Sequence, residues 1–190
     1  GSVTVAAGAA FGGSGRVDWP VTAGAGGSVG AGASAGTLTL GAGLDLSAGG
    51  TNVWELAAES DANPGLDFDQ IVLTGGSLTL GGASRLLIAF SGSATAPDAG
   101  NPFWQASHSW PIISAAGAAA NFTGIENGVF PAGTFATSVQ PTGIVLTFTP
   151  SSGSTPVASF SIAPGPGGDL TLSYSGGTGS QFVLLQTNNL

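Results

Sequence analysis

Cysteine, methionine and lysine are absent from this 190-residue sequence, and histidine occurs once. Without cysteine the chain has no disulfide bonds and no thiolate metal ligands, and without lysine it has no residue for Schiff-base chemistry. Only Arg16 and Arg85 are basic, against ten acidic residues. So few basic side chains cannot neutralise a phosphate backbone, which excludes nucleic acids as partners.

Long apolar runs are missing as well. No stretch approaches the roughly 18 uninterrupted apolar residues of a transmembrane helix, so we expect no insertion into a membrane. The sequence opens with GSVTV and lacks the basic and apolar regions of a signal peptide. We therefore expect that any export signal has already been removed.

Glycine and short alternating runs dominate what remains. The chain has 34 glycines and is 42% hydrophobic but only 6% charged. Apolar residues alternate with small or polar ones in many short runs, and Gly-Gly or Ala-Gly steps close most of them. Runs of this kind include residues 2–5, 36–49, 70–82, 84–92, 142–150, 157–164, 169–177 and 181–187. This pattern predicts an all-β protein rich in turns.

Two segments suggest a repeat. The sequences GTLTLGAGLDL (36–46) and GGSLTLGGASRLLI (75–88) both place a short strand, a glycine corner and a second strand in succession. Short strands that meet at small-residue corners are typical of solenoids, in which each coil stacks its apolar residues on the next. We therefore favour a parallel β-solenoid, or β-helix, over a β-sandwich.

The composition changes along the chain and suggests three segments of one compact domain. Residues 1–92 carry the solenoid repeats. Residues 93–141 are rich in proline and aromatic residues, and are expected to be an irregular insertion or cap. The runs in residues 142–190 are longer, and are expected to form partly antiparallel strands.

The order of the repeat units resembles the autotransporter-associated β-strand repeat family. The units are GSVTVAAGAAFGGSGRV (1–17), GASAGTLTLGAGLDLSAGGTNVWELAA (32–58) and DFDQIVLTGGSLTLGG (67–82). The sequences NPFW (101–104) and SQFVLL (180–185) are also similar to the C-terminal segments of repeat-rich surface proteins of the Verrucomicrobia and Planctomycetes. This resemblance implies a secreted or cell-surface β-solenoid. Because a translocator barrel needs many strands of about ten residues each, we expect this chain not to be a complete autotransporter.

Acidic residues gather in the sequence DANPGLDFD (61–69). The oxygen atoms of Asp61, Asn63, Asp67 and Asp69 are of the kind that Ca²⁺ accepts, but their spacing matches neither an EF-hand nor a repeated β-roll. The favoured interpretation is that these side chains cap a loop through backbone amides. A Ca²⁺ site remains the alternative, and no cofactor is otherwise expected.

Catalysis is not predicted. Asp67 and Asp69 could share one face of a strand as two acids do in glycosidases, but that spacing is not specific. The sequence has no GxSxG motif whose serine the only histidine, His108, could activate as a general base. His108 is therefore interpreted as packing among Phe103, Trp104 and Trp110. The two tryptophans are expected in the core, with stacking on a polysaccharide as the alternative.

The two ends of the chain suggest how it functions. Val3 and Val5 near the start, and Phe182 and Leu184 near the end, belong to alternating strands without charged residues that would block edge pairing. We therefore expect a non-enzymatic extracellular structural protein that binds itself, end to end or by strand exchange, in a fibre, matrix or surface layer. The alternative is a carbohydrate-binding or spacer module of a larger adhesin-like protein.

Overall fold

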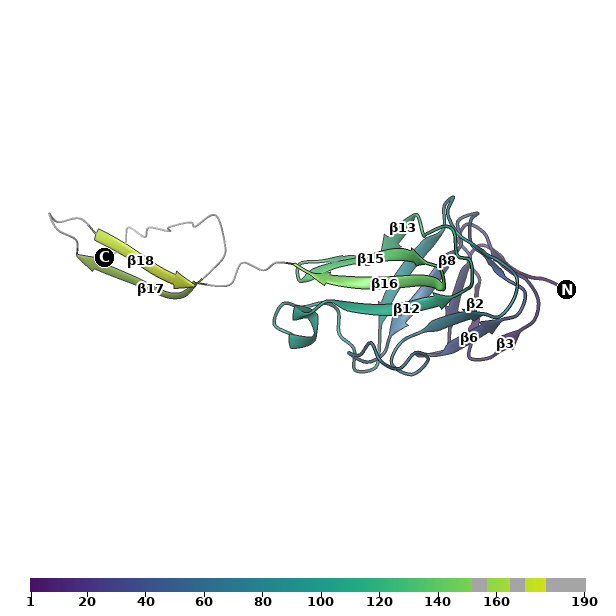
Figure 1. The fold of residues 1–190 in the computed structure, drawn as a ribbon, viewed down its shortest axis with the longest axis horizontal. Coiled ribbons are helices and arrows are strands. Elements are labelled where there is room, and N and C mark those ends of the chain that lie inside the picture. The colour runs from purple at the N-terminus through teal and green to yellow at the C-terminus, as the bar shows by residue number, and fades with distance from the viewer. Residues whose placement is uncertain (152–156, 165–169, 177–190) are drawn as a thin grey trace. The chain divides into compact units, whose positions relative to one another are not determined.

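The computed structural model describes residues 1–151, 157–164 and 170–176. Within them the chain is all-β, with strands β1 to β18 and one short 3-10 helix, η1 (Figure 1). The strands form parallel and mixed sheets, so the predicted all-β class is confirmed.

The chain divides into two compact units, Gly1–Ser151 and Ser152–Leu190. The bounds of the elements in the first unit are β1 Val3–Val5, β2 Ala10–Gly13, β3 Arg16–Val17, β4 Val21–Ala23, β5 Ser28–Ala31, β6 Thr37–Leu40, β7 Leu44–Asp45, β8 Thr51–Leu56, β9 Gln70–Leu73, β10 Leu78–Thr79, β11 Arg85–Phe90, η1 Pro102–Gln105, β12 His108–Ser114, β13 Gly124–Glu126, β14 Val129–Phe130, β15 Gly133–Gln140 and β16 Gly143–Pro150.

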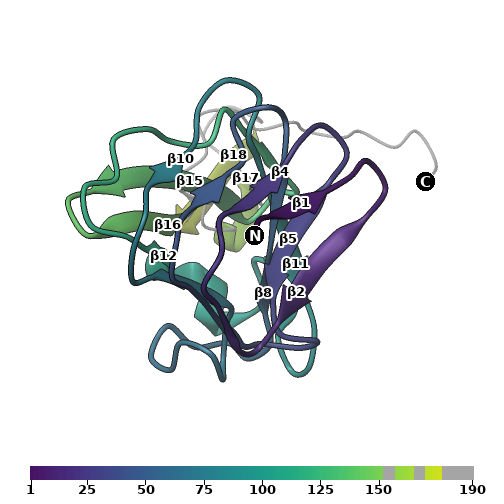
Figure 2. The ribbon, with the colours of Figure 1, turned by 90° about the vertical axis from the view of Figure 1, so that its right-hand side faces the viewer.

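The first twelve strands are distributed in rotation over three sheets. The first sheet has the order β1-β4-β7-β10, and the second has the order β13-β11-β8-β5-β2. The third has the order β14-β15-β16-β12-β9-β6-β3. Each successive triplet of strands, beginning with β1-β2-β3, therefore adds one strand to each sheet. Figure 2 shows β1 and β4 side by side in one sheet, and β2, β5, β8 and β11 in another.

Parallel pairing places apolar residues in columns. In the first sheet Val3, Val21, Leu44 and Leu78 are consecutive register partners. The inward residues of all three sheets join one buried cluster, which is the core of this unit. Because successive side chains on a strand point to opposite faces, the alternation in the sequence is what separates this core from the surface.

The register corrects the predicted alignment of the repeat. Leu78 pairs with Leu44, so SLTL (77–80) lies beside GLDL (43–46). GTLTL (36–40) lies beside QIVL (70–73) instead, because Leu38 pairs with Ile71. The two LTL sequences occupy different sheets, and their likeness comes from the same alternating pattern rather than from equivalent positions.

Glycine allows the corners between strands to stack closely. Gly76, between β9 and β10, has a φ of 70°. A Cβ atom there would overlap the backbone of Ala42 and Gly43 at the corresponding corner between β6 and β7. The glycine steps predicted to end the strands therefore serve both the turn and the contact with the neighbouring corner.

The segment 93–141 was expected to be an irregular insertion or cap, and the structure shows several strands in it. It contains η1, β12, β13, β14 and β15. Pro111 lies inside β12, where it opposes Val145 of β16, and the register shifts between Pro111 and Ile113. Proline is tolerated there because a bulge relieves the strand of one backbone hydrogen bond.

The expected change to antiparallel pairing is observed. Strand β12 pairs in parallel with β9 on one side and antiparallel with β16 on the other. The hairpin β15–β16 then extends the third sheet, and β14 pairs antiparallel with β15. Pairing in the third sheet thus changes direction at β12, whereas β13 still pairs in parallel with β11 in the second sheet.

The second unit contains the antiparallel pair β17 (Val157–Pro164) and β18 (Leu170–Gly176). Both strands coincide with predicted runs. However, β16 belongs to the first unit, so residues 142–190 do not form one segment of a single compact domain as expected. Phe182 and Leu184 lie outside the described residues.

Candidate functional site

The acidic residues lie in the connection between β8 and β9. The backbone carbonyl of Asp67 accepts hydrogen bonds from the backbone amides of Ala57, at 2.7 Å, and Ala58, at 3.0 Å. Leu66 at the tip of this connection is 72% exposed. The connection is therefore closed by backbone hydrogen bonds, whereas the prediction assigned that role to the acidic and asparagine side chains.

Asp69 is the most constrained of these residues. It is buried, and its carboxylate accepts hydrogen bonds from the backbone amides of Gly36 at 2.9 Å and Glu55 at 3.2 Å. Burial raises the pKa of Asp69 to about 7, although the two amides act in the opposite direction and the charge of Glu55 reinforces the rise. Asp69 thus joins the loop to the corner before β6 and to strand β8.

The other predicted Ca²⁺ ligands face different partners. The Asp67 carboxylate accepts a hydrogen bond of 2.7 Å from the Asn63 amide, and Asp61 faces His108 instead. The structure therefore brings Asn63 and Asp67 together but does not gather all four residues. Among the described residues no group of three acidic or histidine side chains is placed to hold a metal ion.

Asp67 and Asp69 do not form a carboxylate pair on one strand face. Strand β9 begins at Gln70, so both aspartates precede it. One carboxylate is turned to the Asn63 side chain and the other is buried against backbone amides. The absence of enzymatic activity stays a prediction.

His108 lies in β12, with its ring 13% exposed. Nδ1 is 3.1 Å from the Asp61 carboxylate, and Nε2 is 2.7 Å from the carbonyl oxygen of Phe103. Its ring is stacked on Phe103, with centroids 3.8 Å apart, and also contacts Trp104 and Trp110. The predicted packing among these aromatic residues is confirmed, in a strand rather than a loop.

Trp104 and Trp110 cannot stack on a polysaccharide in this conformation. Their exposed fractions are 1% and 0%, so the sugar-stacking alternative at these two residues was wrong. Phe135 and Phe148, from the β15–β16 hairpin, pack against Trp104 with ring centroids 5.9 and 4.8 Å away. No local sequence pattern indicated that this hairpin would cover them.

The strands β1, β2 and β3, which we call the leading triplet, each stand at the end of their sheet in the described structure. Val3 is half-buried and Val5 is buried on β1. Phe11 of β2 and Val17 of β3 are also only partly covered. The end of the apolar core is therefore accessible beside three strand edges.

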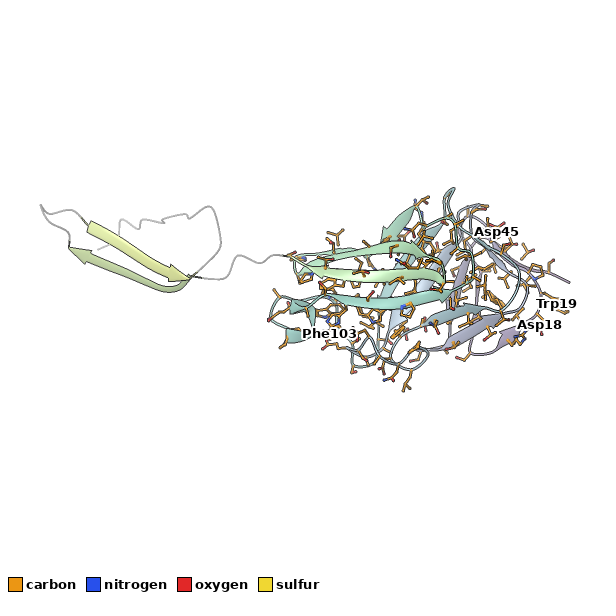
Figure 3. The ribbon with its side chains drawn as sticks, viewed as in Figure 1. Asp18, Trp19, Asp45 and Phe103 are labelled. Carbon is orange, nitrogen blue, oxygen red and sulfur yellow. The ribbon has the colours of Figure 1, made fainter. Side chains whose placement is uncertain are left out.

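Trp19 follows the leading triplet in the chain and is 57% exposed. Figure 3 shows it with Asp18 at the end of the first unit that carries the N-terminus, whereas Phe103 lies at the opposite end of that unit. Arg16 and Asp18 form an exposed ion pair of 2.6 Å. Sequence reasoning missed Trp19, although a tryptophan between a charged residue and a proline is a recognisable surface-turn signal.

A small cavity of about 100 Å³ lies beside the bulge of β12, lined in part by Gln70, Pro111 and Val145. Small-molecule sites usually measure about 300 to 1,000 Å³, so this cavity is too small for an organic ligand. The amide of Gln70 donates a hydrogen bond of 3.0 Å to the Pro111 carbonyl across it.

No protein-family model matches this sequence, and neither curated proteins nor solved structures gave a significant match. The resemblance to autotransporter-associated repeats thus stays a prediction. No helix among the described residues is both long and apolar enough to cross a membrane.

Proposed function

We propose that this protein is a non-enzymatic, extracellular structural subunit built on a parallel β-solenoid, and that it self-associates through the leading triplet. The rotation of twelve strands over three sheets supports the solenoid. In that arrangement β1–β3, β4–β6, β7–β9 and β10–β12 are four successive coils. The extracellular location rests on the sequence resemblance alone.

The observation that carries the proposal is the placement of β1, β2 and β3 together at the ends of their three sheets. A solenoid leaves unpaired backbone groups and apolar side chains at such an end, which must be covered or used for association. The opposite end differs, because β16 pairs antiparallel with β12 and the aromatic side chains of the hairpin cover the core. The two ends of the unit are therefore unequal in their capacity to bind.

A second contact is needed before pairs of molecules extend into a fibre or layer. The alternating sequence QFVLLQT (181–187), with Phe182 and Leu184, is the candidate from the sequence analysis. Removing residues 181–190 is expected to stop growth beyond a closed oligomer and to leave the β-sheet signal in circular dichroism unchanged.

The experiment that tests the proposal is light scattering of the full chain over a range of concentrations. Thr4 is exposed at the centre of β1, and Thr4→Lys places an edge-blocking charge there. Thr22→Lys is the matched control, because Thr22 is exposed on the next strand, β4, which already has two neighbours. Only Thr4→Lys should lower the molar mass.

A monomeric full chain at every concentration would contradict self-association and favour the spacer module. The carbohydrate-binding alternative has lost Trp104 and Trp110 to the core, and the exposed Trp19 is the side chain left to it.

A further inference from the structure

The edge of β1 is open, and apart from its short length the strand has none of the features that usually protect an edge. β1 is the three-residue sequence VTV, without a charged residue, a proline or a bulge. Its pairing partner is β4, and the Val3 amide donates to the Pro20 carbonyl at 2.8 Å on that same side. No other described strand pairs with β1. Natural proteins rarely leave such an edge unprotected unless it is used.

Apolar side chains lie beside this edge. Val3, Phe11 and Val17 cover the end of the core incompletely. Trp19 adds an exposed indole at the same end of the unit (Figure 3). Tryptophan is enriched among the residues that dominate binding energy at protein interfaces. The patch therefore combines strand edges with an aromatic anchor.

Charge indicates which partner this patch can accept. The only charged side chains in residues 1–44 are Arg16 and Asp18, which form an ion pair. The other nine acidic residues all lie at residue 45 or later. The chain as a whole has a net charge of −8. Two copies repel one another at their acidic regions, so the neutral leading triplet is the part that a second copy can approach most closely.

We propose that a second copy of this chain binds the leading triplet head to head about a two-fold axis, with β1 pairing antiparallel to the partner's β1. A two-fold axis perpendicular to β1 makes the two identical strands run in opposite directions. This inference rests on the proposed self-association and specifies its geometry.

The two-fold axis makes a definite structural prediction at Thr4. Thr4 is the central residue of β1, so it lies opposite its own counterpart in the dimer. Directly opposed residues of antiparallel strands have Cβ atoms about 4.5 to 5.5 Å apart, which is close to disulfide geometry. The Thr22 residues of the two β4 strands are three strand spacings apart, or about 14 Å, which is too far for a disulfide.

The absence of native cysteine permits a direct test. Full-length Thr4→Cys and Thr22→Cys variants are oxidised with the same glutathione redox buffer, and the disulfide-linked dimer is measured by non-reducing electrophoresis. We expect Thr4→Cys to cross-link rapidly and Thr22→Cys to cross-link only at the rate of random collision. Circular dichroism checks that both variants keep the β-sheet signal.

The role of Trp19 is tested in parallel by Trp19→Ala in the full chain. Loss of an anchor tryptophan should weaken dimerisation about tenfold or more in sedimentation equilibrium. If Trp19→Ala leaves dimerisation unchanged but abolishes binding of a soluble neutral glucan, the residue is a sugar-binding side chain and its assignment to the dimer contact is overturned.

The results distinguish failure of the two-fold contact from failure of self-association itself. Equal cross-linking of the two cysteine variants, in a chain whose molar mass still rises with concentration, would overturn the two-fold contact and leave self-association in place. A chain that stays monomeric would overturn both.

Discussion

The carboxylate of Asp69 accepts a hydrogen bond of 2.9 Å from the backbone amide of Gly36, across 33 positions of sequence. Its second oxygen accepts from the amide of Glu55, and its backbone carbonyl accepts from the indole of Trp54 at 2.9 Å. Three elements of the first unit therefore meet at one residue. This makes Asp69 a structural residue.

Asp69→Ala should lower the free energy of unfolding by about 2 to 4 kcal/mol, because it leaves two buried backbone amides without acceptors. Urea unfolding of the full chain measures the effect. Asp67→Ala is the matched control, since its carboxylate contacts only the Asn63 side chain at the surface, and it should cost less than about 1 kcal/mol. Equal losses in the two variants would contradict the structural role.

The raised pKa of Asp69 makes stability depend on pH. Its folded-state pKa is about 7, against 3.8 in the unfolded chain, so the unfolded chain loses this proton first as the pH rises. From this group alone, the free energy of unfolding should fall between about pH 4 and pH 7, by at most about 1.4 kcal/mol per pH unit, and be constant above that.

The comparison that isolates this effect uses Asp69→Asn, which does not titrate. The free energy of unfolding of both proteins is measured in urea between pH 4 and pH 8. The advantage of the original chain over the variant should decrease as the pH rises to 7. Parallel profiles would mean that Asp69 ionises at its ordinary pKa.

Gly76→Ala should destabilise the first unit by about 2 kcal/mol or more, because φ is positive there and the new Cβ overlaps the neighbouring corner. Gly15→Ala is the control, since a Cβ at Gly15 has no neighbour within 4 Å. Thermal unfolding followed by circular dichroism compares the two variants. A smaller loss for Gly76→Ala than for Gly15→Ala would show that the corners do not stack as described.

His108→Ala should lower the free energy of unfolding by about 1 to 3 kcal/mol, because it removes the polar contacts of the ring with Asp61 and the Phe103 carbonyl, and the stacked contact with Phe103. Ser109→Ala, at the adjacent exposed position, should change stability by less than about 0.5 kcal/mol. Chemical unfolding provides both values. If the two substitutions had the same effect, His108 would not hold the acidic loop to β12.

Calcium should not change the stability of the protein, because the four candidate ligands face separate partners. A ligand that binds only the folded state raises the melting temperature as its concentration increases. Melting curves with excess Ca²⁺ and with EDTA should therefore coincide. A shift of several degrees between them would restore the calcium hypothesis for the acidic loop.

The sequence predicted strands well where alternation is strict. The runs at 142–150 and 157–164 became β16 and β17, since period-two alternation directly reflects the two faces of a strand. It did not predict which strands pair. Leu78 lies beside Leu44 and Leu38 lies beside Ile71, and a local pattern does not record which run stacks on which.

Local signals misled the prediction in the middle of the chain. Pro111 argued against a strand at 108–114, yet the bulge accommodates it. The dipeptide Asn127-Gly128, between β13 and β14, is a strong turn signal that the sequence prediction did not use, and Asn127 has a φ of 56°. Burial of Trp104 depends on the returning hairpin and is a property of the whole fold.

For the candidate site, the sequence predicted the roles of residues better than their partners in space. Asp69 was expected to support a loop, but its partners Gly36 and Glu55 are far away in the sequence and could not be named. Val3 and Val5 were placed on an open edge, and the structure puts β1 at the end of its sheet. Trp19, at the same end, needed the structure to be noticed.

Negative-stain electron microscopy of the purified full chain tests the central claim most directly, because it distinguishes monomers, closed dimers and filaments. Self-association through the leading triplet predicts paired or extended particles for the original chain and for Thr22→Lys, and single particles for Thr4→Lys. Single particles in all three preparations, at concentrations where light scattering also reports a monomer, would contradict it.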